Sequence, residues 1–248
     1  MKETCTRLLA GALWLVAVQV HAELTGRSEA GYVMARGNAE TDTANAKLEL
    51  IQDYGRWKHT FGLAGLYGST SDNVTAQRWD TRWQTDHKFS DRMYWFGGFR
   101  YEDDEFSGFD FQGIVTTGLG RRFIDSLNTK FSVQIGAGYR RLRSEQLIRN
   151  DTGYVIDRVL GEADSDFVGN MGVDFEHAFN SSTTLINKLV VETGSRNTLT
   201  QNQLSLQVKM NEVLALALGF NVRNNSDPPN NLERTDTLTT VNLVYELR

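Results

Sequence analysis

One short stretch, residues 201–220 (QNQLSLQVKMNEVLALALGF), limits what this chain can fold into. Every second residue from Leu204 to Met210 is apolar, and after a two-residue polar break the alternation restarts at Leu214 and continues to Phe220. Side chains on a β-strand point alternately to opposite faces. The stretch therefore predicts two strands, each with one apolar face and one polar or small face.

The same alternation recurs along the chain after residue 22 and predicts twelve strands. Their expected ranges are 28–36, 43–54, 57–69, 75–89, 92–102, 109–123, 129–141, 165–179, 183–194, 198–210, 213–224 and 236–247. Most are longer than the ~5–6 residues usual in soluble sheets and match the ~9–11 residues that cross a bilayer. Short polar turns alternate with longer connections, as in transmembrane barrels.

The polar faces of these strands are too charged for the core of a soluble β-sandwich. The chain has 23% charged residues and a mean hydropathy of −0.40, so we expect the apolar faces to meet lipid and the polar faces to line a lumen. The predicted fold is a single all-β, transmembrane antiparallel β-barrel of about twelve strands, with short periplasmic turns and longer extracellular loops. The lumen-lining candidates are Arg78, Asp80, Arg82, Asp86, Lys88, Arg100, Lys130, Arg140, Asp174, Glu176 and Lys209.

Residues 1–22 have the layout of a secretory signal peptide: a basic start, an apolar run over 8–20 and small residues before the cleavage position. The run is too short to span a membrane as a helix. We therefore expect the exported protein to comprise residues 23–248, without Cys5, the only cysteine of the chain. A net charge of −5 argues against nucleic acid as a partner.

Several stretches resemble a known family, the YdiY-like salt-induced outer membrane proteins of Gram-negative bacteria. They are GYVMARGNAETDTANAKLEL (31–50), YGRWKHTF (54–61), RYEDDEFSGFDFQG (100–113), GAGYRR (136–141) and VNLVYELR (241–248). The resemblance implies a β-barrel in the outer membrane, and it carries no catalytic or ligand residues. It implies as partners the outer-membrane lipids and lipopolysaccharide, with periplasmic chaperones and the barrel assembly machinery during biogenesis. Relatives tend to end on an aromatic residue, whereas here Leu247 takes that place.

Few residues suggest chemistry. The three histidines outside the signal, His59, His87 and His177, share the apolar register of their strands near the tight turns, which predicts an interfacial girdle. A catalytic histidine needs a nucleophile and an orienting partner within reach, and the sequence offers no obvious set. We therefore expect no enzymatic activity and no cofactor.

An acidic stretch is the one candidate metal site. Carboxylate oxygens are the ligands that Mg²⁺ and Ca²⁺ prefer, although the spacing here does not fit a Ca²⁺ loop. The stretch is either a solvated outer loop or a place where a divalent cation bridges the barrel to lipopolysaccharide phosphates. In the second case Phe106, Phe109 and Phe111 lie at the outer interface. The candidate ligands are Glu102, Asp103, Asp104, Glu105 and Asp110.

Three functional classes remain, and the resemblance favours the first. The first is a narrow, weakly selective pore or plugged structural barrel linked to envelope, salt or osmotic stress. The second is a surface-binding, adhesin-like barrel that acts through the expected outer loops 142–165 and 225–235. The third is a lipid-modifying enzyme in a barrel wall. The sequence leaves open whether loop 142–165 plugs the lumen or stands outside.

Overall fold

A computed structural model describes residues 23–35, 41–71, 73–105, 107–149, 155–228 and 232–247. Within these ranges the chain forms twelve antiparallel strands. They are β1 (Glu23–Ala35), β2 (Thr41–Tyr54), β3 (Trp57–Thr70), β4 (Asn73–Lys88), β5 (Met93–Asp104), β6 (Phe109–Asp125), β7 (Thr129–Arg149), β8 (Val155–Ala178), β9 (Thr183–Gly194), β10 (Thr198–Lys209), β11 (Leu214–Asn225) and β12 (Thr235–Leu247). No helix in the described ranges is long and apolar enough to cross a bilayer. The predicted signal peptide, residues 1–22, lies outside the described residues.

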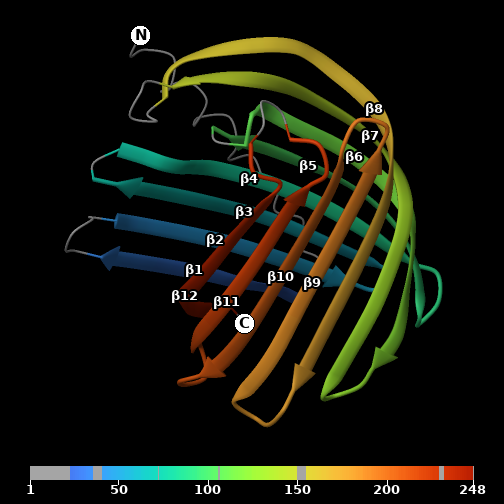
Figure 1. The fold of residues 1–248 in the computed structure, drawn as a ribbon. Coiled ribbons are helices and arrows are strands. Elements are labelled where there is room, and N and C mark those ends of the chain that lie inside the picture. Colours follow the sequence, from blue (N-terminus) through green and yellow to red (C-terminus); the bar gives the residue numbers. More distant parts are fainter. Residues whose placement is uncertain are drawn as a thin grey trace, which may run out of the picture.

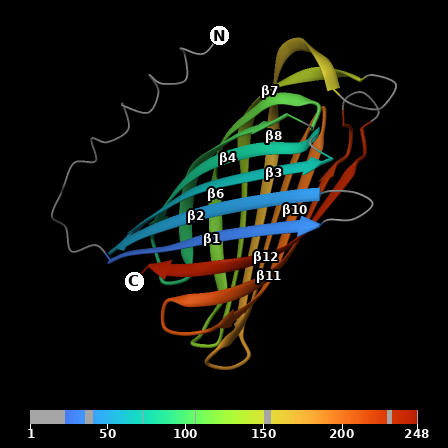
Figure 2. The same ribbon diagram turned by 90° about the vertical axis from the view of Figure 1, so that its left-hand side faces the viewer.

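The strands form a closed barrel in which each strand pairs with its sequence neighbours and β1 pairs with β12 (Figures 1 and 2). Tight turns join β2 to β3, β4 to β5, β6 to β7, β8 to β9 and β10 to β11, all at one side of the barrel. We call this side the turn end; β1 begins there and β12 ends there. The first tight turn contains Gly55 at φ +56°, a left-handed conformation that glycine adopts without strain. The opposite side, where longer connections lie, is the loop end. The predicted all-β barrel of twelve strands is confirmed.

The alternation places apolar side chains outside and polar or small ones inside. On β11, Leu216 is 48% exposed whereas its neighbour Ala217 is 1% exposed. On β12, Leu243 is exposed and Val244 is buried. The apolar face of residues 201–220 therefore faces outward, as predicted, in a position that lipid must cover if the barrel spans a bilayer.

Aromatic side chains gather at both ends of this outer surface. At the turn end, Trp57 stacks on His59 and lies against His87, and His177 lies against Phe179. Towards the loop end, three further ring contacts join neighbouring strands, namely Trp79–Tyr101, Tyr101–Phe111 and Tyr139–Phe167. Two aromatic belts are typical of transmembrane barrels, since such rings suit the headgroup layers.

Strands β7 and β8 differ from expectation. Residues 142–165 were expected to be a loop, but residues 142–149 and 155–165 continue the two strands beyond the rest of the barrel (Figures 1 and 2). Their ladder continues from Leu142 paired with Asp164 to Arg149 paired with Val155, with two register shifts. We call these residues the projecting hairpin. It neither plugs the lumen as an irregular loop nor stands free of the sheet.

Candidate functional site

Two cavities in the lumen are lined by described residues. The loop-end cavity has a volume of about 380 Å³ and lies among β1–β5 and β9–β12. The turn-end cavity, of about 630 Å³, lies among β2–β10. Both are lined by Glu49, Arg82 and Lys188, so these three side chains stand at the boundary between the cavities.

These three residues form an ion-paired cluster that spans the lumen. Arg82 Nη2 lies 2.5 Å from Glu49 Oε2, and Lys188 Nζ lies 3.0 Å from the same oxygen. Glu49 is on β2 and Lys188 on β9, which are five strands apart around the barrel. The contact between them therefore crosses the lumen rather than following the wall.

A second chain of ion pairs crosses the lumen nearer the loop end. Arg100 on β5 contacts Glu192 on β9 at 2.6 Å and Glu102 on its own strand at 3.1 Å. Glu102 in turn contacts Arg223 on β11 at 2.5 Å. β5 and β11 are six strands apart in a barrel of twelve, so this pair joins opposite walls. Glu102, Glu192 and Arg223 are buried, which makes the contact nearly inaccessible to bulk water.

Aromatic rings occupy part of the lumen at the turn end. Tyr94 and Phe96 on β5 are buried, and each is paired across the ladder with a glycine of β6, Gly120 and Gly118 respectively. A Cβ added to Gly118 would lie 2.8 Å from the Phe96 ring, and one added to Gly120 would lie within the Tyr94 ring. The two rings therefore fill the space that these inward glycines leave. The cross-strand pairing of these aromatic residues with glycines can be recognised only once the strand register is known.

Most predicted lumen-lining residues lie where the alternation placed them. Arg78 and Asp80 line the loop-end cavity, and Arg82 lines both cavities. Five others line the turn-end cavity: Asp86, Arg100, Lys130, Asp174 and Glu176. The other three lie against the wall. Lys88 pairs with Asp53 at 2.6 Å, Arg140 is 0% exposed and makes two hydrogen bonds to Asp166, and Lys209 lies beside the last tight turn, where its backbone N–H donates to the carbonyl of Ser182. The alternation also places the transluminal partners on inward faces, but it does not predict which of them meet; they are Glu49, Glu102, Lys188, Glu192 and Arg223.

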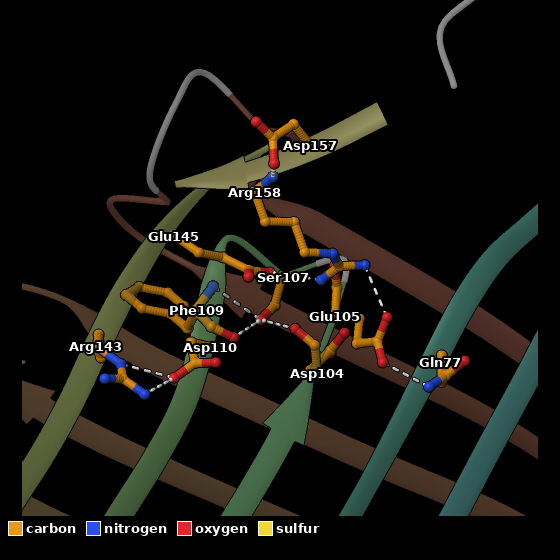
Figure 3. Close-up of polar contacts among 10 residues, drawn as sticks. All are labelled: Gln77, Asp104, Glu105, Ser107, Phe109, Asp110, Arg143, Glu145, Asp157 and Arg158. Atoms are coloured by element: carbon orange, nitrogen blue, oxygen red, sulfur yellow. Dashed lines mark hydrogen bonds and ion pairs between the residues drawn. The ribbon is translucent and has the colours of Figure 1, made fainter. Parts of the chain in front are cut away.

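The acidic stretch is neutralised by arginines (Figure 3). Arg158 of the projecting hairpin donates to the Glu105 carboxylate at 2.7 Å and to Glu145 at 3.1 Å, and Gln77 donates to Glu105 at 2.5 Å. Asp110 pairs with Arg143 at 2.5 Å. Burial raises the pKa of the Glu145 carboxyl above its ordinary value, and Arg158 opposes that rise. The cluster ties the hairpin to the β5–β6 connection.

The candidate metal ligands are consequently dispersed. Glu102 points into the lumen towards Arg223, and the carboxylate of Asp104 lies 3.9 Å from Arg78. Within the described ranges, no group of three or more His, Cys, Asp or Glu side chains is placed to hold a metal ion. Phe109 is buried rather than at the outer interface, because register shifts at Phe109–Phe111 change its face; Phe106 lies outside the described residues.

The histidines lie in the turn-end belt. His59 is within hydrogen-bond distance of the Tyr54 hydroxyl at 3.0 Å and of Thr85 at 2.9 Å. His177 Nδ1 lies 2.9 Å from the Thr129 hydroxyl. These neighbours hold the rings in place at the surface.

Comparison with known proteins gives the family. A family model described as "Protein of unknown function, DUF481" matches residues 28–247. The "Uncharacterized protein YdiY" of Escherichia coli K12 is 25% identical over 227 residues, covering 90% of this chain and 82% of that protein. Among solved structures, the NanC porin covers 91% of this chain and all of its own, with a TM-score of 0.50 and 11% identity.

The translocator domain of the autotransporter NalP from Neisseria meningitidis also has a TM-score of 0.50. It is 10% identical and covers 94% of this chain and 90% of its own. At such identities these two likenesses concern the fold alone, which is that of outer-membrane barrels. The sequence match over nearly the whole barrel, from β1 to β12, establishes that the chain belongs to the DUF481 family and is a YdiY-like barrel protein.

Proposed function

We propose that the barrel resides in the outer membrane of a Gram-negative bacterium and acts there as a narrow, weakly selective pore that is obstructed at rest by ion pairs and responds to salt or osmotic stress. The observation that carries the proposal is the transluminal contact of Glu102 with Arg223, with Glu49 and Lys188 bridging between the two cavities.

Weak selectivity follows from the mixed lining. Strongly selective pores tend to carry rings of one charge sign. Here each transluminal contact joins a carboxylate to an ammonium or guanidinium, so neither permeant cations nor anions meet a uniform field. The aromatic rings of Tyr94 and Phe96 narrow the turn end further.

A response to salt follows from screening. The Debye length is ~10 Å at 0.1 M and ~3 Å at 1 M ionic strength. Arg82 and Lys188 are about two-fifths exposed to the lumen, so their pairs with Glu49 weaken as ions enter the cavities. High external salt thereby opens the lumen.

The test is single-channel recording on the refolded barrel in a KCl series from 0.1 to 1 M. We expect low conductance at 0.1 M and a rise steeper than that of bulk conductivity. Lys188→Gln, which removes a bridging cation, should raise the conductance at 0.1 M and flatten the series. Lys209→Gln, which removes the same charge beside a tight turn, should leave both unchanged. A large, strongly selective current at low salt in the unmodified protein contradicts the proposal.

The projecting hairpin favours a second function, binding at the cell surface. Beyond the loop-end belt it exposes four aliphatic side chains, Ile148, Ile156, Val159 and Leu160. Exposed apolar side chains on a projecting element are typical of contact surfaces. Whole-cell binding assays test this function by comparing parent cells with cells in which a short turn replaces residues 145–160. If both kinds of cell bind every tested surface equally well, this function is contradicted.

The proposed partners are those of an outer-membrane barrel: lipids and lipopolysaccharide around the wall, and the assembly machinery with periplasmic chaperones during biogenesis. We propose no catalytic role. In the described part of the chain, His59 contacts Tyr54 and Thr85, and His177 contacts Thr129 and Phe179, in the outer aromatic belt, which supports the role of an interfacial girdle.

A further inference from the structure

The seam that closes the barrel is paired over less than half of its length. Five register pairs join Gly26–Ala30 of β1 to Leu243–Leu247 of β12, whereas every other neighbouring strand pair among the described residues has at least eleven. All five lie in the turn-end half. Towards the loop end the two strands diverge, as Figure 1 shows.

Both diverging halves remain ordered strands. Tyr32 of β1 is paired with Ala44 of β2, and Val241 of β12 is paired with Leu218 of β11. Each half is thus held by its other neighbour. The divergence is a gap in one ladder, not a loss of strand structure.

A polar clasp marks the point where pairing stops. Asn242 Nδ2 donates to Glu29 Oε2 at 3.0 Å, and Asn45 Nδ2 donates to Asn242 Oδ1 at 3.1 Å. Gly31 lies inside this clasp, where an added Cβ would be 2.1 Å from Asn242 Oδ1 and 2.9 Å from the Val241 carbonyl. Glycine therefore lets the three strands approach here, and the strands separate beyond it.

The loop-end cavity lies directly behind the diverging halves. It is lined on one side by Asn45 and Lys47 of β2 and on the other by Leu238, Thr240 and Asn242 of β12. Residues on both flanks of the seam thus face a single space of about 380 Å³.

The level of the opening suits an amphipathic molecule. Tyr32 is 59% exposed and its hydroxyl donates to Asp42 at 2.8 Å, the disposition of an interfacial tyrosine. The last seam pair, Ala30 with Leu243, lies beside Leu216 in the middle of the lipid-facing surface, so the seam diverges from there towards the headgroups of the membrane leaflet at the loop end.

The chemistry behind the seam favours an anionic headgroup. Arg27 lines the cavity; its Nη2 pairs with Glu29 at 2.8 Å, and its buried Nε has no hydrogen-bond partner among the described residues. Lys47 also lines the cavity, and no described carboxylate lies within ion-pair distance of its ammonium. Buried donors of this kind are normally satisfied by an acceptor, and a phosphate or carboxylate oxygen supplies one.

We propose that the loop-end cavity binds the phosphate or carboxylate headgroup of an amphipathic molecule, which enters laterally between the loop-end halves of β1 and β12 and leaves its chain in the membrane. Lys47 and Arg27 contact the headgroup, and Leu238 contacts the first carbons of the chain. The proposal does not depend on whether the lumen conducts ions, although the site lies in a lumen cavity.

The first arm of the test measures the seam. The Tyr32→Cys/Val241→Cys pair continues the register of the Ser28→Cys/Tyr245→Cys pair by four residues, so the two pairs share a face and a hydrogen-bonding class. In the refolded barrel of residues 23–248, which has no native cysteine, the lower pair should form a disulfide readily. The upper pair should be linked only by a longer bis-maleimide. Equally fast disulfide formation in both pairs overturns the lateral opening.

The second arm measures binding with a bimane label on Leu238→Cys in a neutral maltoside detergent. Dodecyl phosphate brominated on the second and third carbons of its chain should quench the label saturably, and the corresponding brominated maltoside should not. Lys47→Gln should weaken half-saturation at least tenfold, whereas Lys209→Gln should change it less than twofold. Cross-linking the upper cysteine pair with bis-maleimide should abolish the quenching.

Two results overturn the proposal. One is absence of saturable quenching by the phosphate amphiphile. The other is that inorganic phosphate competes at the same concentration as the amphiphile and that the cross-link does not change the quenching. Both results are expected if the site binds a free anion that enters through the barrel mouth.

Discussion

Glu102 and Arg223 face each other across the full width of the barrel, with Oε1 and Nη2 2.5 Å apart. They stand on β5 and β11, which share no ladder. Arg100 contacts the same carboxylate, so Glu102 is held between two guanidinium groups. A contact of this kind holds opposite walls at a fixed separation.

The first prediction concerns this pair. Glu102→Gln should lower the free energy of unfolding by about 3–5 kcal/mol, because it leaves a buried guanidinium without its counter-charge. The double variant Glu102→Gln/Arg223→Gln should recover part of the loss. Urea titration of the refolded barrel measures both. Glu176→Gln, which removes a half-exposed carboxylate 4.0 Å from Lys130, should have little effect, and an equal loss in this control contradicts a special role for the transluminal contact.

The second prediction concerns the two faces of β11. Leu216→Arg should cost ~2–4 kcal/mol of unfolding free energy, since it places a charge at the middle of the lipid-facing surface. Ala217→Arg should cost much less because that side chain lines the loop-end cavity. Refolding titrations in lipid vesicles compare the two. Equal losses indicate that the barrel is not embedded as proposed.

The third prediction uses two inward or wall glycines with different surroundings. A Cβ on Gly118 would lie 2.2 Å from the Ile135 carbonyl oxygen, whereas one on Gly65 would have no neighbour closer than 4.0 Å. Gly118→Ala should therefore lower the midpoint of urea unfolding. Gly65→Ala should leave it unchanged or raise it slightly, because alanine restricts the unfolded chain. The reverse order is incompatible with the close approach of β6 to β7.

The fourth prediction concerns the projecting hairpin. Arg158→Ala removes the contacts with Glu105 and Glu145 and should speed protease cleavage within 142–165 without changing global unfolding. Arg196→Ala breaks an exposed ion pair with Asp164, which is on β8 like Arg158, and should not speed cleavage. Timed digestion followed by mass spectrometry locates the cleavage sites. Identical digestion of both variants shows that the Arg158 contacts do not hold the hairpin.

The fifth prediction concerns location. The exported protein should begin at Glu23, fractionate with the outer membrane and migrate differently on gels before and after boiling, as closed barrels do. N-terminal sequencing and fractionation of the natural host measure this. Recovery from the soluble periplasm, with one band at all temperatures, contradicts membrane residence.

Much of the fold could be predicted because one periodicity encodes it. In β10 and β11 each second residue is apolar, and the structure places those residues outside. The same rule located Arg78, Arg82 and Asp174 in the lumen. It failed in residues 142–165, where both faces of the strands are largely polar because neither is embedded in the apolar belt.

The details of the lumen could not be predicted, since they depend on register between strands. In β5, aromatic residues occupy both faces at 94–96, so the sequence does not reveal that Tyr94 and Phe96 point inward onto glycines of β6. Contacts such as Glu49 with Lys188 join strands with no common ladder. No local pattern specifies which charges meet across a closed barrel.

The short seam between β1 and β12 has a consequence for how the chain folds. Eleven of the twelve strand pairings are hairpins between consecutive strands and form locally, whereas the seam joins residues as distant as Asn242 and Glu29, 213 positions apart. Long-range pairing of this kind is slow, and until it forms the sheet has two unpaired edges, which are prone to aggregation. Among the described residues, only five ladder pairs and the Asn242 clasp then convert an open sheet into a barrel. Closure of the barrel therefore depends on the pairing of β12, the last strand.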